Sequence, residues 1–304
     1  MRHPLSLAVA ALGGAALLFA LSLHPSVHWR MEVLRLKALG RLSTVSSPEL
    51  LGRLLSADPE YNGGRWVMGS ATLRDTRGEA PCPATFDTPL GVFHADLADE
   101  FDVEWFVDKF LGLNLAQTSR GLMPRIEPGD VVIELGGWVG VFTRYALRQG
   151  AAKVVVLEPV ADTRECFRRA FAAELEDGRV ELIEAAAWDR AGRLRMTLEG
   201  PNNYTGGTEG WHVADEGPLE VAAVTVDAVV AELGLERVDL LEMDIEGAER
   251  HALAGARGTI RRFAPEIAVC VHHLPDDPEA IAALMREIRP EYQVRADDRH
   301  ALYF

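Results

Sequence analysis

The chain has 304 residues, of which 48% are hydrophobic and 25% are charged, as in ordinary globular proteins. This length suits one large α/β domain with a smaller appendage. The net charge of −15 disfavours a nucleic-acid partner, because phosphate binding depends on clustered Lys and Arg side chains. The three cysteines, Cys82, Cys166 and Cys270, lack the spacing of a metal site or a redox pair, so we expect free thiols in a reducing compartment.

The N-terminal segment contains a long apolar run. Residues 5–23 carry no charge and approach the ~20 residues with which a helix crosses the hydrocarbon core of a bilayer. Basic residues cluster after this run, which is not typical of a signal peptide and, by the positive-inside rule, places the following chain in the cytoplasm. We therefore predict a single-pass membrane anchor over residues 1–24, with the catalytic domain facing the cytoplasm. A cleaved signal peptide and a peripheral helix are the alternatives.

Residues 25–126 are predicted to form a linker and a small N-terminal extension. Turn-forming Ser, Pro, Asn and Gly residues recur between residues 42 and 64, around one short predicted helix over residues 48–56. Further along, residues 91–94 favour a short strand, and residues 102–111 place apolar side chains at helical spacing. We expect this extension to pack against the main sheet.

From residue 127 to residue 304, short apolar runs alternate with amphipathic stretches. This alternation predicts a doubly wound, Rossmann-like, mostly parallel α/β sheet whose ligand lies beyond the carboxyl ends of the strands. The predicted strands span residues 131–135, 153–157, 179–184, 238–243 and 266–271. The predicted helices span residues 138–149, 160–175, 247–254 and 277–288. Residues 301–304 are a candidate edge strand, and residues 199–218 are interpreted as either an acceptor-side lid or a surface insert.

The first of these strands leads into a glycine-rich turn, Glu134-Leu-Gly-Gly-Trp-Val-Gly140. Glycine lets the backbone turn sharply and approach a ligand, and the following helix presents free N–H groups to that ligand. The second strand ends in Glu158, where such folds commonly place an acid that accepts hydrogen bonds from ribose hydroxyls. This stretch therefore predicts a cofactor that contains a nucleoside.

The glycine spacing distinguishes between nucleoside cofactors. Dinucleotide binding requires G-x-G-x-x-G, and the first glycine of that pattern would fall on Leu135. The pattern present, Glu134-x-Gly136-x-x-x-Gly140, resembles the first motif of class I S-adenosylmethionine-dependent methyltransferases, whose cofactor carries a sulfonium cation that acids suit. A nicotinamide-dependent oxidoreductase and a non-catalytic, membrane-tethered binding protein with the same fold stay open as alternatives.

A second acidic stretch follows the predicted strand at residues 238–243. Glu242, Asp244 and Glu246 recur at every second position, as side chains on one face of a strand would. Asp244 is expected at the mouth of the sheet, beside the cofactor strand. Glu246 and Glu249 fall in or near the first turn of the next helix, where acids complement the helix dipole.

Taken in order, these stretches resemble the FkbM-type family of S-adenosylmethionine-dependent methyltransferases. The resemblance covers residues 127–304 and rests on Glu134-Leu-Gly-Gly-Trp-Val-Gly140, Leu157-Glu-Pro159, Ala186-Ala187-Trp188-Asp189, Thr225-Val-Asp227, Asp239-Leu-Leu-Glu-Met-Asp-Ile-Glu-Gly-Ala-Glu249 and His272-His273. One departure is Glu242, which stands at a position that the family usually gives to lysine. It puts any lysine-dependent substrate contact in doubt.

The resemblance implies a methyl donor and a set of site residues. The donor is S-adenosyl-L-methionine, and the cofactor-binding residues are Glu134, Gly136, Gly140, Glu158, Ala187 and Asp244. The implied reaction is in-line methyl transfer to a hydroxyl of a sugar, lipid-like or secondary-metabolite acceptor.

Asp244, His272 and His273 are the candidate bases for this reaction. We assign the catalytic role to Asp244 and His273, because a histidine accepts protons near neutral pH and His273 occupies the family position. Strand alternation would send His272 and His273 to opposite faces. Carboxylates such as Asp244 and Glu246 also ligate Mg²⁺, but their spacing is too common to assign a metal.

Overall fold

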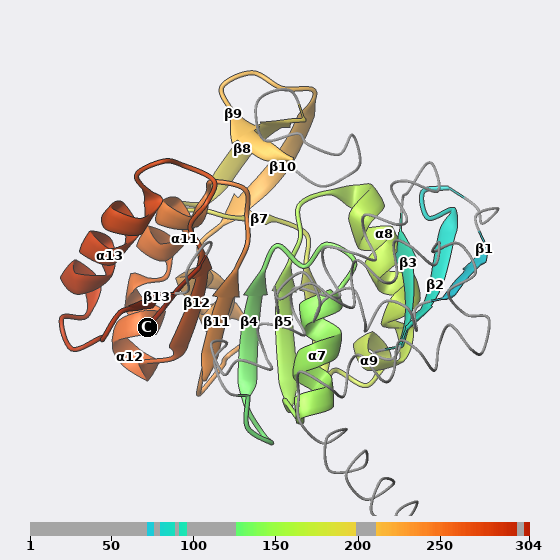
Figure 1. Ribbon diagram of the computed structural model, residues 1–304, viewed down its shortest axis with the longest axis horizontal. Coiled ribbons are helices and arrows are strands. Elements are labelled where there is room, and N and C mark those ends of the chain that lie inside the picture. The colour runs from blue at the N-terminus through green and yellow to red at the C-terminus, as the bar shows by residue number, and fades with distance from the viewer. Residues whose placement is uncertain (1–71, 76–79, 89–90, 96–125, 199–210, 297–300) are drawn as a thin grey trace, which may run out of the picture. The chain divides into compact units, whose positions relative to one another are not determined.

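The computed structural model describes residues 72–75, 80–88, 91–95, 126–198, 211–296 and 301–304 (Figure 1). The chain divides into two compact units, one of residues 1–72 and 105–116 and one of residues 73–104 and 117–304. The second unit holds the sheets and helices described below. The helices predicted over residues 48–56 and 102–111 lie outside the described residues, and the domain boundaries predicted after residues 24 and 126 stay predictions.

A seven-stranded sheet, with strand order β13-β14-β12-β11-β4-β5-β6, forms the centre of this unit (Figure 1). Five of its strands pair in parallel: β4 (Val131–Leu135), β5 (Lys153–Leu157), β6 (Val180–Ile183), β11 (Leu240–Met243) and β12 (Glu266–Cys270). β14 (Ala301–Tyr303) pairs antiparallel with β12, and β13 (Arg295–Ala296) forms the edge. The predicted doubly wound, mostly parallel sheet is confirmed.

Seven helices are found in the described part of this sheet domain. They are α7 (Val141–Gln149), α8 (Ala161–Ala170), α9 (Ala172–Glu176), α10 (Val226–Glu232), α11 (Glu249–Gly255), α12 (Arg257–Phe263) and α13 (Asp277–Ile288). The helix predicted over residues 160–175 is interrupted at Phe171, which ends α8 and precedes α9. Two helices, α10 and α12, were not predicted, because seven residues make barely two turns of apolar periodicity.

The central strands are apolar on both faces, which is why they read as continuous hydrophobic runs. In β4 and β5 every residue after the first is buried, including the acid Glu134. Their side chains pack with those of β11 and β12 in one core, of which Ile133, Leu241 and Val269 are members. Each such side chain contributes on the order of 1.5–3 kcal/mol when fully buried. This core fixes the strand ends that carry the candidate site residues.

A second, four-stranded sheet has the order β7-β10-β8-β9 and was not predicted. Its strands are β7 (Ala186–Ala187), β8 (Gly192–Thr197), β9 (His212–Ala214) and β10 (Leu219–Val224). Met196 and Val221 form a small core of their own with Ala186. The segment interpreted as a lid or surface insert therefore includes β9, while residues 199–210 lie outside the described residues.

The part of the N-terminal extension that the structure describes is a three-stranded sheet of β1 (Thr72–Asp75), β2 (Ala84–Thr88) and β3 (Gly91–Ala95). The strand predicted over residues 91–94 is confirmed. β3 lies against α8, the helix that follows β5.

A disulfide between Cys82 and Cys166 ties this extension to α8, across a sequence separation of 84 residues. The prediction of three free thiols is therefore wrong, and the reducing compartment inferred from it loses its basis. Cys270 is the one free cysteine of the described residues. Sequence alone does not give disulfide connectivity, and a long separation of the partners offers no local signal.

The predicted membrane anchor over residues 5–23 lies outside the described residues. Among the helices that the structure does describe, none is long and apolar enough to cross a bilayer. The predicted localisation, a single-pass membrane protein with its catalytic domain facing the cytoplasm, is corrected on this finding.

Candidate functional site

The carboxyl ends of β4, β5 and β11 bring the predicted cofactor residues other than Ala187, which lies on β7, to one edge of the main sheet (Figure 1). β4 lies between the other two strands, and backbone hydrogen bonds continue past the strand ends. The Gly136 N–H donates to the Leu157 carbonyl at 2.9 Å, and the Asp244 N–H donates to the Leu135 carbonyl at 3.2 Å. The turns that follow the three strands are therefore held side by side.

The glycines of the turn after β4 allow three close approaches. Gly136 and Gly140 have φ values of +89° and +88°, which favour glycine. A Cβ at Gly136 would lie 2.3 Å from the Asp244 carbonyl oxygen, one at Gly137 would lie 2.1 Å from Val156 Cγ1, and one at Gly140 would meet Phe171 at the same 2.1 Å. The sequence analysis assigned Gly136 and Gly140 to cofactor binding. The structure shows that Gly137 has equally little room for a side chain.

Glu158 joins the turn after β4 to the end of β5. One carboxylate oxygen accepts a hydrogen bond from the Trp138 N–H at 2.9 Å, and the other accepts one from the Val160 N–H at 2.9 Å. Burial raises the pKa of Glu158 to about 7, against the opposing effect of these hydrogen bonds and of Arg164. Each oxygen keeps a further lone pair that can accept a hydrogen bond from a ligand hydroxyl.

Glu134 is buried within the sheet and accepts a hydrogen bond from the Thr143 hydroxyl of α7. Glu242 is its direct neighbour on β11. Burial raises the pKa of Glu134 to about 8, with Thr143 opposing and Glu158 adding repulsion. Burial and the charges of Glu134 and Asp244 raise the pKa of Glu242 well above its usual range. We infer that this pair retains a proton near neutral pH.

Ala187, the remaining predicted cofactor residue, points its side chain into the main core. The residue after it, Trp188, donates its backbone N–H to the Val224 carbonyl at 2.8 Å. Its indole ring stacks on the imidazole of His251 of α11, with the ring centroids 3.8 Å apart. His251 Nδ1 lies 2.6 Å from Asp189 Oδ2. A contact of Ala187 with a ligand would therefore involve its backbone.

An open pocket of about 680 Å³ lies beside this stack. Its lining combines Trp188 and His251 with side chains of the small sheet: Arg190, Arg193, Leu194, Arg195, Val213, Ala214, Asp215 and Glu220. Glu134, Glu158 and Asp244 are not part of this lining. Sequence reasoning missed the pocket, because the strands that form it are short and rich in arginine.

The structure brings the two predicted catalytic residues together. His273 follows β12, and its side chain is 3% exposed. Its Nε2 lies 3.4 Å from Asp244 Oδ1 and 3.4 Å from Glu246 Oε2, and its Nδ1 lies 2.9 Å from Glu249 Oε1. Glu249, which the sequence assigned to the helix dipole, is fully buried and is thus part of the site.

The surrounding carboxylates change the protonation of His273. Burial lowers the pKa of His273, but the contact with Glu249 and the charges of Asp244, Glu249 and Glu246 outweigh it and raise the pKa to about 9. His273 therefore carries a proton near neutral pH. The reason for which the sequence favoured it as a base, an unperturbed pKa near 6.5, does not apply in the folded site.

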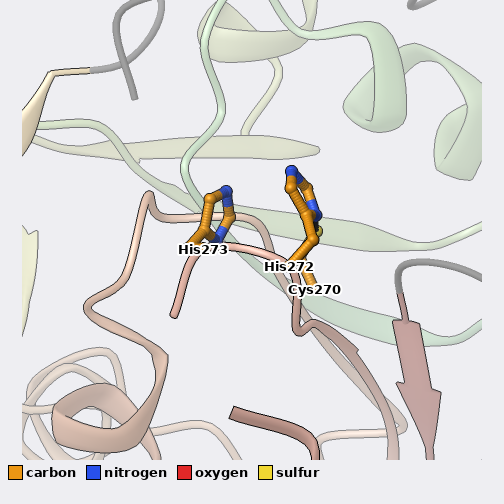
Figure 2. A group of neighbouring side chains, drawn as sticks. All are labelled: Cys270, His272 and His273. Atoms are coloured by element: carbon orange, nitrogen blue, oxygen red, sulfur yellow. Dashed lines mark hydrogen bonds between the residues drawn. The ribbon is translucent and has the colours of Figure 1, made fainter. Parts of the chain in front are cut away.

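His272 is exposed, and its Nδ1 lies 2.8 Å from Cys270 Sγ. The two imidazole rings have centroids 4.2 Å apart and project to the same side of the backbone (Figure 2). β12 ends at Cys270, so both histidines belong to the loop that follows it. Strand alternation therefore does not separate them, contrary to the prediction.

The chain matches known proteins over this sheet domain. Residues 132–293, more than half of the chain, match the family model "Methyltransferase FkbM domain". The chain is 29% identical over 155 residues to the 2-O-methyltransferase NoeI of Sinorhizobium fredii, which covers 45% of this chain and 61% of NoeI. It is 25% identical over 190 residues to the 31-O-demethyl-FK506 methyltransferase FkbM of Streptomyces tacrolimicus, covering 53% and 72%.

A crystal structure of Methyltransferase FkbM from Methylobacillus flagellatus KT is 19% identical to this chain, with a TM-score of 0.47. The match covers 68% of this chain and 56% of that one. The chain thus spans less than two thirds of NoeI and of this crystallised protein.

Proposed function

The chain belongs to the FkbM methyltransferase family, and we propose that it transfers a methyl group from S-adenosyl-L-methionine to a hydroxyl group. The observation that supports this most directly is the junction of three strand ends. Glu158 binds the glycine turn through the Trp138 N–H, and the same turn lies against the Asp244 backbone through Gly136. A nucleoside cofactor is expected at such an edge of a parallel sheet.

The residues at this edge fit the chemistry of the proposed cofactor. Glu158 keeps lone pairs that can accept hydrogen bonds from ribose hydroxyls. Because Gly136 has no side chain, the turn after β4 packs directly against the backbone of Asp244. Asp244 adds a carboxylate that suits a cationic ligand. When bound, the cofactor would supply the activated methyl group on its sulfonium. The protein orients the acceptor, excludes water and receives the hydroxyl proton, for which Asp244, held beside the protonated His273, is the proposed destination.

The names of the two curated relatives support an oxygen acceptor. One is named a 2-O-methyltransferase, and the other is named for a 31-O-demethyl substrate. We carry over from these names only the class of acceptor, a hydroxyl on a sugar, lipid-like or secondary-metabolite molecule.

The two alternatives are weaker. A nicotinamide cofactor would need a glycine at the position of Leu135, which is fully buried as the last residue of β4. A non-catalytic binding protein would have the same cofactor site but would transfer no methyl group, so only an activity measurement separates it from the methyltransferase.

Calorimetry on the full-length chain tests the proposal. We expect S-adenosyl-L-methionine and its demethylated product to bind, and NADH to give no heat. A screen with the donor labelled on its methyl group should then transfer label to at least one hydroxylated acceptor. Binding of NADH without the methyl donor would favour the oxidoreductase, and binding of the donor without transfer to any acceptor would favour the binding protein.

A further inference from the structure

We propose that Cys270, His272 and His273 bind a transition-metal ion such as Zn²⁺. Cys270 is the last residue of β12, and the two histidines stand in the loop that follows it. Each of the three residues offers one ligand atom, and these atoms all lie within 4.8 Å of one another. Figure 2 shows both imidazole rings projecting to the same side of the backbone, with Cys270 next to His272.

The end of β12 explains how three ligands within four residues converge. In an extended strand the neighbours His272 and His273 would point to opposite faces. Because the strand ends at Cys270, this restriction does not apply, and the centroids of the two rings are 4.2 Å apart. The sequence analysis compared the cysteines only with one another, so it missed a set that combines one cysteine with two histidines.

His273 gives an independent sign that the cluster accepts a further partner. Its side chain is 3% exposed, yet both ring nitrogens lack a hydrogen-bond partner among the described residues. Buried side-chain nitrogens are usually hydrogen-bonded, because an unpaired polar group loses its hydration without compensation. An ion coordinated by one of these nitrogens would supply the missing interaction.

Glu249 is placed to orient His273 toward such an ion. It is fully buried, and its Oε1 lies 2.9 Å from His273 Nδ1 and accepts a hydrogen bond from the Ile245 N–H at 3.0 Å. A metal-binding histidine commonly directs its second ring nitrogen to a carboxylate, which fixes the ring and leaves the first nitrogen for the metal. Glu249 is thus a positioning residue for His273 in this proposal.

The donor set selects the kind of ion. One thiolate and two imidazoles suit Zn²⁺ or Co²⁺, whereas Mg²⁺ and Ca²⁺ prefer oxygen ligands. Cys270 Sγ lies 2.8 Å from His272 Nδ1. In a tetrahedral zinc site a sulfur and a nitrogen ligand are about 3.6 Å apart, so the ion would separate these two groups by roughly 0.8 Å. His272 is exposed, which gives its ring room to turn.

The ion would take the place of protons. Coordination requires a thiolate and neutral imidazoles, so the protons of Cys270 and His273 leave to solvent as the metal binds. A positive charge would therefore remain beside Asp244, whose Oδ1 lies 3.4 Å from His273 Nε2.

The site would also have a role in the reaction, and this role alone rests on the proposed function. Three protein ligands leave the fourth position of a tetrahedral ion open. An acceptor hydroxyl coordinated there would have a lowered pKa, so that its proton passes more readily to the neighbouring Asp244. Binding of the ion itself needs neither methyl donor nor acceptor.

Titration of the full-length, non-reduced protein with Co²⁺, after treatment with a chelator, tests the assignment. Cys82 and Cys166 form the disulfide, so Cys270 is the one cysteine of the sequence that carries a thiol. A charge-transfer band from thiolate to Co²⁺ therefore identifies Cys270 itself. We expect one ion per chain with this band, and loss of the band on addition of Zn²⁺, which binds more tightly. Zn²⁺ should also slow the reaction of Cys270 with a thiol reagent.

Variants of the ligands separate them from their neighbours. Cys270→Ser should abolish the charge-transfer band. His272→Ala and His273→Ala should weaken Co²⁺ binding by at least about 100-fold, because loss of an orienting partner alone typically costs 10–100-fold. Glu249→Gln should fall within that smaller range.

His251→Ala is the matched control, since His251 is an exposed imidazole that contacts Asp189. It should leave Co²⁺ affinity within a factor of about 3, far below the loss of an orienting partner. Circular dichroism and thermal melting establish that each variant folds, and His272→Ala, at an exposed position, keeps the test open if the other ligand variants do not fold.

Three results would overturn the assignment. The first is that Co²⁺ does not bind. The second is binding without a thiolate band, which would place the ion on Asp244, Glu249 and His273, whose ligand atoms also lie within 4.8 Å of one another. The third is unchanged binding in a folded His272→Ala protein. None of these outcomes depends on methyl transfer.

Discussion

Glu158 is the residue on which the proposed cofactor site depends most. It anchors the glycine turn through two backbone N–H groups and keeps lone pairs for a ligand. Asp244 and His273 define the other side of the site, together with Glu246 and Glu249. Burial and the charges of neighbouring groups therefore determine the pKa values of the carboxylates and of His273 in this site.

Replacing Glu158 by Gln should weaken binding of S-adenosylhomocysteine. The loss of a charge-assisted hydrogen bond costs on the order of 1.5–3 kcal/mol, or roughly 10- to 150-fold in affinity. Calorimetric titration measures it. Glu181→Gln is the matched control, because Glu181 is a partly exposed acid on the neighbouring strand β6 that contacts Lys153. Equal affinity of the Glu158 variant and the native protein would show that the ribose contact is misplaced.

Replacing Glu242 by Gln should flatten the pH dependence of stability. Glu134 has a folded pKa of about 8, above its ordinary value of 4.5. The folded state therefore binds more protons than the unfolded state between these pH values, so the free energy of unfolding falls as pH rises from about 4.5 to about 8. Burial and the charge of Glu134 also raise the pKa of Glu242 well above its ordinary value, so Glu242→Gln removes a second group that makes stability fall as pH rises.

Urea denaturation of both proteins at pH 5 and pH 8 measures the effect. We expect a smaller difference between the two pH values for the Glu242→Gln variant than for the native protein. An identical difference in both proteins would mean that the Glu242 carboxyl does not contribute to the pH dependence of stability.

At the scale of elements, the turn between β4 and α7 is fixed by packing. Gly137 faces Val156 on β5, and Gly140 faces Phe171, which ends α8. These contacts hold the turn against two neighbouring elements, so that its backbone has one position relative to Glu158. The glycines are therefore required by packing before any ligand is considered.

Gly137→Ala should destabilise the protein by about 1–3 kcal/mol or more, as expected for overpacking. The added Cβ would lie 2.1 Å from Val156 Cγ1. Gly192→Ala is the matched control, since a Cβ there has no atom within 4 Å and Gly192 lies at the start of β8. The midpoints of urea denaturation compare the two variants. Equal midpoints would contradict the packing of the turn.

At the scale of the whole molecule, the disulfide joins the N-terminal sheet to the main domain. Cys82 precedes β2, and Cys166 lies in α8, against which β3 packs. Closing a loop of 84 residues restricts the unfolded chain by about 4–5 kcal/mol in the chain-entropy model.

Thiol titration of the denatured, non-reduced protein should find one reactive cysteine, Cys270, and three after reduction. The Cys82→Ala, Cys166→Ala double variant should unfold at lower urea concentration than the native protein by an amount that corresponds to 2–5 kcal/mol. Three reactive thiols before reduction would show that the disulfide does not form.

The main sheet could be predicted because its strands are continuous apolar runs, and β4 and β5 have the predicted bounds. The small sheet could not, since β8 exposes arginines on a six-residue strand that resembles a loop. Asp244 was proposed from its place after a predicted strand and His273 from its family position, and the structure brings these two side chains together. The contact between Glu249 and His273 was missed, because it joins two segments whose pairing only the folded sheet reveals.

The central claim is that the ends of β4, β5 and β11 form one cofactor site. A crystal structure of the full-length protein with S-adenosylhomocysteine tests it most directly. We expect the nucleoside beyond these strand ends, with its ribose hydroxyls within hydrogen-bonding distance of the Glu158 carboxylate. A nucleoside bound elsewhere, for example in the pocket beside Trp188 and His251, with Glu158 out of contact, would contradict the account.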